Sequence, residues 1–174
     1  PSNASSMRYP NAGTDAAALF GTSNNFYVQH GGATNLTAEL DREMYFNFAG
    51  LDPSLRYDVA LYGDRNTSSD GYEIFTISGI DGATNRSSSG TVFSKDVTKL
   101  ETRPNAGNGY VARWTDIDPG SDGLFQIAID PRESWSKNLA YLTAMRLSNV
   151  PEPSSVVLAA LGLLGLVWAA RRRK

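Results

Sequence analysis

The stretch Arg56-Tyr-Asp-Val-Ala-Leu-Tyr62 decides the fold class, because apolar and polar side chains alternate along it. In an extended strand the second, fourth and sixth residues of this stretch share one face. The same period of two recurs in Leu124–Ile129 and Leu139–Leu147. Alternation of this kind predicts antiparallel strands with one buried face and one wet face.

On both sides of this stretch, short runs of β-branched and aromatic residues alternate with clusters of Gly, Pro, Asn and Asp. The predicted strands are Phe26–His30, Met44–Phe48, Arg56–Tyr62, Tyr72–Ser78, Thr91–Phe93, Tyr110–Trp114, Leu124–Ile129 and Leu139–Leu147. Either Asp15–Phe20 or Leu36–Met44 is expected to form a helical turn. This pattern predicts an all-β, two-sheet antiparallel β-sandwich of the jelly-roll kind, followed by one C-terminal hydrophobic helix.

Length and composition divide the chain of 174 residues into three parts. We expect an irregular N-terminal segment at 1–24, the β-sandwich at 25–149 and a separate C-terminal segment at 150–174. Without the four terminal cations, 12 basic residues face 18 acidic ones, a net charge of −6. So acidic a body lacks the basic surface that nucleic acid requires. The chain has no Cys, which excludes disulfides and thiolate metal sites.

The C-terminal segment combines three features. Pro151-Glu152-Pro153 precedes an apolar run of 15 residues, and four cations follow it. A helix of that length spans roughly 23 Å, just short of a bilayer core, and flanking cations extend its reach. The membrane segment is therefore placed at 154–170. The terminal cations are expected on the cytoplasmic side, and the body of the protein on the other side of the membrane. Its apolar residues include Val156, Leu158, Leu161, Leu164, Val167 and Trp168, and the basic anchor is Arg171, Arg172, Arg173 and Lys174.

Three other kinds of segment share some of these features. A buried core helix is disfavoured, because the run is apolar on all faces and ends in cations. A glycosylphosphatidylinositol signal has an apolar tail but no terminal basic cluster. An ordinary single-span anchor remains open.

Pro-Glu-Pro, an apolar helix and a terminal Arg cluster together resemble the PEP-CTERM sorting signal of Gram-negative bacteria. The resemblance implies an exported protein that is recognised by an exosortase and processed near the Pro-Glu-Pro triplet. It further implies a body outside the cytoplasm, anchored in the inner membrane and then delivered to the cell surface or extracellular matrix. An exported protein needs a leader, so Pro1 is expected to begin a mature or shortened chain.

The body is loosely similar to galactose-binding-like sandwich modules. The similar stretches are Tyr57–Gly63, Asp122–Ile129 and Ala140–Leu147, the last of which leads into the sorting signal. The similarity is one of strand pattern, and it assigns no functional residues.

Two oxygen-rich loops are candidate calcium sites. Asp116, Asp118 and Asp122 alternate in a loop that contains Gly, where carboxylates can converge on a cation. The loop lacks the spacing of an EF-hand, and ordinary Asx turns are the alternative. Asp64–Asp70 is a second loop of the same kind.

Catalysis has weak support in the sequence. His30 is the lone histidine, and no Gly-x-Ser-x-Gly motif accompanies it. A glycosidase would need two carboxylates about 5–10 Å apart. The available glutamates are Glu39, Glu43, Glu73, Glu101 and Glu133. We expect these to be solvated surface acids, and His30 to end a strand.

Aromatic side chains on the surface could stack on sugar rings. Trp135 lies in a polar loop where no core period requires it, and is the first candidate sugar contact. Tyr62 and Tyr110 lie at predicted strand ends, whereas Trp114 is expected in the core.

The leading hypothesis is a non-catalytic exported protein that binds extracellular polysaccharide. A small carbohydrate-active hydrolase with paired carboxylates and a purely structural matrix component are the alternatives. The expected partners are an exosortase, the membrane and polysaccharide, and calcium is the one candidate cofactor.

Overall fold

The computed structural model describes residues 10–21, 43–64, 71–88, 91–132 and 142–150. These residues form one short helix and nine strands. The helix is α1 (Asp15–Phe20), and the strands are β1 (Met44–Phe48), β2 (Arg56–Tyr62), β3 (Gly71–Ser78), β4 (Gly82–Asn85), β5 (Thr91–Val92), β6 (Val97–Arg103), β7 (Ala112–Asp118), β8 (Phe125–Arg132) and β9 (Ala144–Val150).

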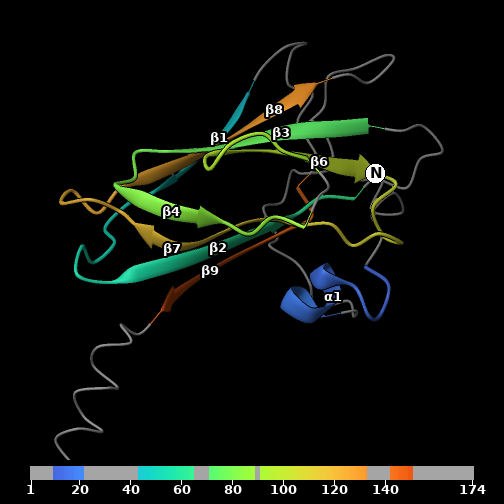
Figure 1. Ribbon diagram of the computed structural model, residues 1–174, viewed down its shortest axis with the longest axis horizontal. Helices are drawn as coiled ribbons and strands as arrows, with labels where there is room; N and C mark the ends of the chain where they lie inside the picture. The colour runs from blue at the N-terminus through green and yellow to red at the C-terminus, as the bar shows by residue number, and fades with distance from the viewer. Residues whose placement is uncertain (1–9, 22–42, 65–70, 89–90, 133–141, 151–174) are drawn as a thin grey trace, which may run out of the picture.

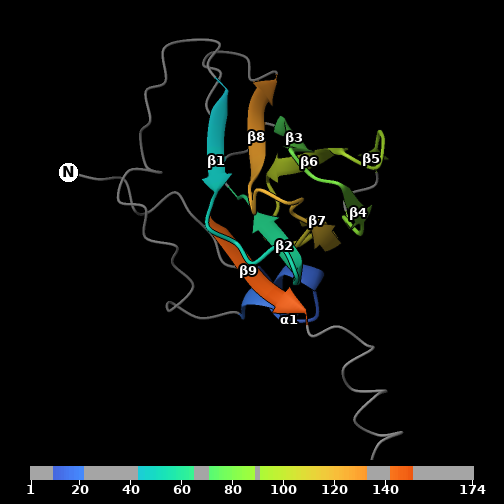
Figure 2. The same cartoon turned by 90° about the vertical axis from the view of Figure 1, so that its left-hand side faces the viewer.

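The strands form two antiparallel sheets that lie as two layers (Figures 1 and 2). One sheet has five strands in the order β1-β8-β3-β6-β5, and the other has four in the order β4-β7-β2-β9. The prediction of an all-β, two-sheet antiparallel architecture is thereby confirmed. The predicted C-terminal hydrophobic helix lies outside the described residues.

The core lies between the sheets and follows the period of two. In β2, Val59 and Leu61 are fully buried, and Ile127 and Ile129 of β8 are buried from the facing sheet. Full burial of an aliphatic side chain contributes about 1.5–3 kcal/mol. Trp114 is buried as expected, and its indole N–H donates a 2.9 Å hydrogen bond to the Lys95 carbonyl.

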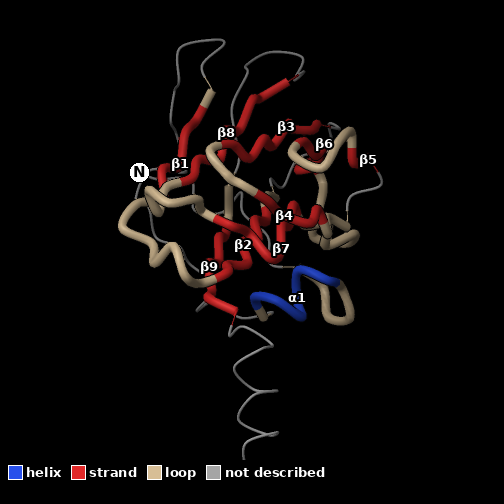
Figure 3. The backbone as a smooth tube through the Cα atoms, turned by 60° about the vertical axis from the view of Figure 1, so that its left-hand side comes forward, coloured by secondary structure: helices blue, strands red, loops and turns tan. Residues whose placement is uncertain are grey.

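Helix α1 covers one end of the outer face of the four-stranded sheet (Figure 3). The Thr14 hydroxyl caps its start by accepting from the Ala17 N–H at 3.2 Å. Ala16 packs in one apolar cluster with Tyr62, which is completely buried. Tyr62 ends β2 as predicted, and its burial makes it a packing residue and not a surface aromatic.

Some predicted elements differ from those observed. The strands β4 and β6 were missed, and β7 begins two residues after the predicted Tyr110 and extends to Asp118. The helical turn at Asp15–Phe20 is confirmed. The predicted strand Phe26–His30 and nearly all of the alternative turn at 36–44 lie outside the described residues.

Three connections meet at one end of the sandwich, and we call them the loop end: residues 49–55, 79–81 and 119–124 (Figure 1, left). The Leu51 N–H donates to the Gly123 carbonyl at 3.1 Å, and the Asp81 N–H donates to the Asp118 carbonyl at 3.0 Å. These backbone bonds tie the three connections to one another.

Candidate functional site

Strand β9 brings the predicted sorting signal directly to the loop end. Asn149 is paired with Tyr57, and Val150 with Arg56, so the last described residue lies beside the start of β2. β9 is the outermost strand of its sheet. Pro151, Glu152 and Pro153 follow immediately in the sequence and lie outside the described residues.

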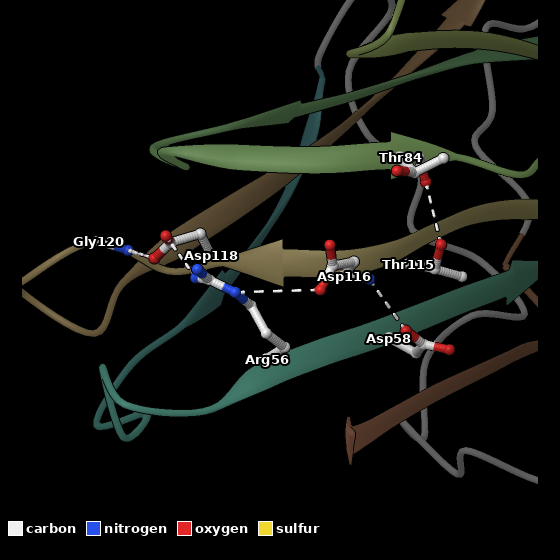
Figure 4. A network of polar contacts seen from close by, with 7 residues as sticks. All are labelled: Arg56, Asp58, Thr84, Thr115, Asp116, Asp118 and Gly120. Carbon is white, nitrogen blue, oxygen red and sulfur yellow. Dashed lines mark hydrogen bonds and ion pairs between the residues drawn. The ribbon is translucent and has the colours of Figure 1, made fainter. Parts of the chain in front are cut away.

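Arg56 also organises a polar network on the outer face of this sheet (Figure 4). Its Nη1 forms an ion pair with Asp118 Oδ2, and its Nε lies 3.9 Å from Asp116 Oδ1. Asp118 Oδ1 accepts the Gly120 N–H at 3.1 Å. The Gly120 N–H, and then Arg56, lower the pKa of Asp118, although partial burial opposes them.

A β-bulge in β7 places Asp116 in this network. The register of β7 shifts by one residue between Trp114 and Ile117 against β2, and between Thr115 and Asp118 against β4. Asp116 has a φ of 57°, and no other described non-glycine residue has a positive φ. The extra residue of a bulge re-aims its side chain, and that of Asp116 is 73% exposed.

These contacts favour ion pairs and turns over calcium in the loop from Asp116 to Asp122. The Arg56 guanidinium forms an ion pair with Asp118, so this carboxylate already has a cationic partner. Asp122 Oδ1 accepts the Leu124 N–H at 3.2 Å, as in an Asx turn. Within the described ranges, no group of three or more His, Cys, Asp or Glu residues could hold a metal ion.

The second oxygen-rich loop begins with a structural carboxylate. Asp64 is buried, and its Oδ1 accepts the backbone N–H groups of Asn105 at 2.5 Å and Ala106 at 2.8 Å. The Asp64 N–H donates to the Thr143 hydroxyl at 3.0 Å. Asp64 thus links the segments that contain Asn105 and Thr143, at the end of the sandwich opposite the loop end. The rest of this loop, residues 65–70, lies outside the described part of the chain.

The outer face of the five-stranded sheet carries an exposed aromatic ring that the sequence reasoning did not single out. Tyr45 of β1 is 53% exposed. Two residues further along this face, the Gln126 amide donates to the Asn47 side-chain oxygen at 2.7 Å. The ring and the amide pair lie on the face of the sheet that points away from the core. We call Tyr45, Asn47 and Gln126 the β1–β8 face.

Carboxylates flank the Tyr45 hydroxyl. Its O–H donates to Glu43. This hydrogen bond, then desolvation and the negative charges of Glu43 and Asp130, raise the pKa of Tyr45 above its ordinary value. Tyr45 therefore stays a neutral phenol at physiological pH.

The predicted glutamates do not all share one site. Glu73 faces the core with its partner Leu100, whereas Glu101 pairs with Tyr72 on the outer face. Glu73 is buried, so the expectation that it is a solvated surface acid was wrong. Glu39 and Glu133 lie outside the described residues.

The remaining candidates are distributed as follows. Tyr110 is half-buried and packs against the core cluster. His30 and Trp135 lie outside the described residues, so their roles remain predictions. The membrane segment at 154–170 and the basic anchor also lie outside them. In the part of the chain that is described, no helix is long and apolar enough to cross a membrane.

Comparisons with known proteins bear on the C-terminal segment. No curated protein and no solved structure matches the chain. The similarity of the body to galactose-binding-like modules therefore stays a prediction. A sorting signal of the PEP-CTERM kind implies export, membrane anchoring and processing by an exosortase. Residues 149–174 match the family model of the PEP-CTERM protein-sorting motif, which confirms the signal predicted from Pro151-Glu152-Pro153 and the residues after it.

Proposed function

We propose that the chain is a non-catalytic surface protein whose body binds extracellular polysaccharide through the β1–β8 face. The exposure of Tyr45 beside the amide pair of Asn47 and Gln126 is the observation that carries the proposal. The sorting signal supports it by delivering the body outside the cytoplasm, where such polymers occur.

The chemistry of the β1–β8 face suits a sugar. The CH groups of a pyranose ring pack against an aromatic plane, and side-chain amides both donate to and accept from hydroxyl groups. The amides of Asn47 and Gln126 are already held in position by their 2.7 Å hydrogen bond. A group that is positioned before binding loses less conformational entropy when a ligand arrives.

A glycan array with the detergent-solubilised full chain tests this proposal. Selective binding is expected, with a loss of up to about tenfold for Tyr45→Ala, because a stacked aromatic ring contributes about 0.5–1.5 kcal/mol beyond the area that it buries. Phe93→Ala is the matched control, since Phe93 is 57% exposed on the turn between β5 and β6. Equal binding by Tyr45→Ala and the parent chain would show that the binding site does not include Tyr45. Trp135→Ala would then be the next variant to test.

A hydrolase is the second candidate, because the negative charges of Glu43 and Asp130 both raise the pKa of Tyr45. Two carboxylates around one exposed ring are compatible with acid and base roles at a bound sugar. Incubating each bound glycan with the parent chain, Glu43→Gln and Asp130→Asn separates the two candidates. Turnover that either substitution abolishes would replace the binding proposal by the enzymatic one. A structural matrix component predicts neither binding nor turnover, and self-association instead.

A further inference from the structure

The sorting signal and the folded body overlap by two residues. The family match begins at Asn149, and Asn149 and Val150 are the last two residues of β9. Both are paired with β2, to Tyr57 and Arg56. No spacer therefore separates the sheet from the Pro-Glu-Pro triplet, since Pro151 is covalently attached to a paired residue.

The distance from the sheet to the predicted membrane segment is short. Residues 151–155 lie between Val150 and the uninterrupted apolar run that starts at Val156. Six Cα–Cα steps therefore separate Val150 from Val156, and at about 3.3–3.6 Å per step an extended chain spans at most roughly 22 Å over them. Whatever conformation they adopt, Val150 lies no further than that from the start of the run.

The loop end surrounds the point where the chain leaves the body. Val150 lies beside Arg56, which directly follows the connection at 49–55 and contacts Asp118 before the connection at 119–124. The backbone bonds from Leu51 to Gly123 and from Asp81 to Asp118 hold these connections together. The loop end is thus one hydrogen-bonded surface that is attached to the end of β9.

We propose that the loop end is the surface of the unprocessed chain that faces the lipid bilayer. The short tether brings this end to the headgroups and directs the opposite end, at residues 104–111, away from them. The inference rests on the membrane anchoring that the C-terminal sorting signal implies. An enzyme that cuts near Pro151 must then work in the narrow space between the loop end and the bilayer.

The charge of the loop end excludes attraction to anionic lipids as the cause of this orientation, which leaves the tether as the cause. Asp52, Asp81, Asp118 and Asp122 lie in or next to the three connections, with Arg56 among them. A surface with this excess of carboxylates is repelled by anionic lipids. Electrostatic repulsion from anionic headgroups would therefore oppose the orientation that the tether imposes.

Single-cysteine labelling can test the orientation, because the chain contains no Cys. Ser121→Cys places a fluorophore on the exposed connection between β7 and β8, and Asn108→Cys places it on the exposed connection at the opposite end. The full chain is reconstituted into phosphatidylcholine vesicles that carry a headgroup-attached quencher. We expect several-fold stronger quenching at position 121 than at position 108. Equal quenching, or stronger quenching at 108, would overturn the proposal.

A linker variant isolates the contribution of the tether. Inserting a long Gly-Ser segment between Val150 and Pro151 should abolish the difference between the two positions, because a flexible linker releases the orientation. A difference that persists would overturn the tether mechanism. Sedimentation of the chain with the vesicles distinguishes the claim of membrane anchoring from the claim of orientation. A chain that fails to sediment contradicts the membrane anchoring itself, whereas a sedimenting chain with equal quenching contradicts only the orientation.

Discussion

The Asp58 carboxylate accepts the backbone N–H of Asp116 at 3.1 Å, across a gap in the ladder between β2 and β7. The bulge at Asp116 takes this N–H out of the regular register, and a side chain supplies the acceptor that the neighbouring strand does not. The other Asp58 oxygen accepts from Arg113 at 3.2 Å. One carboxylate therefore holds both the bulge and the strand that leads into it.

Asp58→Ala should lower the free energy of unfolding by about 1–2 kcal/mol, because it removes the acceptor of the Asp116 N–H and the partner of Arg113. Asp58→Asn keeps an oxygen for the N–H and should cost less. Urea unfolding of both variants measures the difference. If the two losses were equal, the charge on Asp58 would matter and the bond to the bulge would not.

Asp116→Gly should be neutral or raise the free energy of unfolding by up to about 1 kcal/mol. Gly adopts a positive φ without steric cost, whereas the φ of Asp116 is 57°. Asp116→Val should lower stability instead, since a β-branched residue is strained there. Thermal unfolding of the two variants provides the comparison, and greater stability of the Val variant would contradict the assigned bulge.

Asp118 should make stability depend on acid pH. Its folded pKa is held below the unfolded value of about 3.9 by the Gly120 N–H and Arg56. The stabilisation is therefore complete above the unfolded pKa and is lost as pH falls through the lower folded pKa. The pKa of Asp52 is also lowered, chiefly by Ser54. Urea midpoints from neutral pH to about pH 3 should consequently fall less for Asp118→Asn than for the parent chain, with a smaller decrease remaining.

Two glycine variants test how firmly the loop end is packed. Gly50 and Gly123 both have a positive φ, of 70° and 63°. A Cβ at Gly50 would meet no atom within 4 Å, whereas one at Gly123 would lie 2.2 Å from the Leu51 carbonyl oxygen. Gly50→Ala should therefore cost about 1–2 kcal/mol from backbone strain alone, and Gly123→Ala clearly more. Similar losses in chemical denaturation would show that the connections at 49–55 and 119–124 separate easily.

The sequence predicted β1 and β2 most closely, whereas the alternating run Leu139–Leu147 covers only part of β9, which is Ala144–Val150. The bounds predicted for β1 and β2 are the observed ones. The strand β6 was missed because polar Thr98 and Thr102 occupy core-facing positions beside Leu100. The end of β7 was missed because the extra residue at Asp116 breaks the period of two.

The site was harder to predict than the fold, because its members come from distant parts of the chain. Asp116 and Asp118 had the spacing of cation ligands, but the cation that meets them is Arg56 of another strand. Tyr45 stands out only when the register shows that it points away from the core and lies near the Asn47–Gln126 pair. The sorting signal was predictable because all its parts are contiguous in the sequence.

The central claim is that a folded β-sandwich ends at Val150 and is delivered by a removable C-terminal signal. Intact mass spectrometry of the mature protein from cell-envelope and extracellular fractions tests it most directly. We predict a C-terminus between Pro151 and Ser155, with the apolar segment and the terminal cations absent. Recovery of the chain with Lys174 intact in both fractions would contradict processing and leave an ordinary membrane anchor.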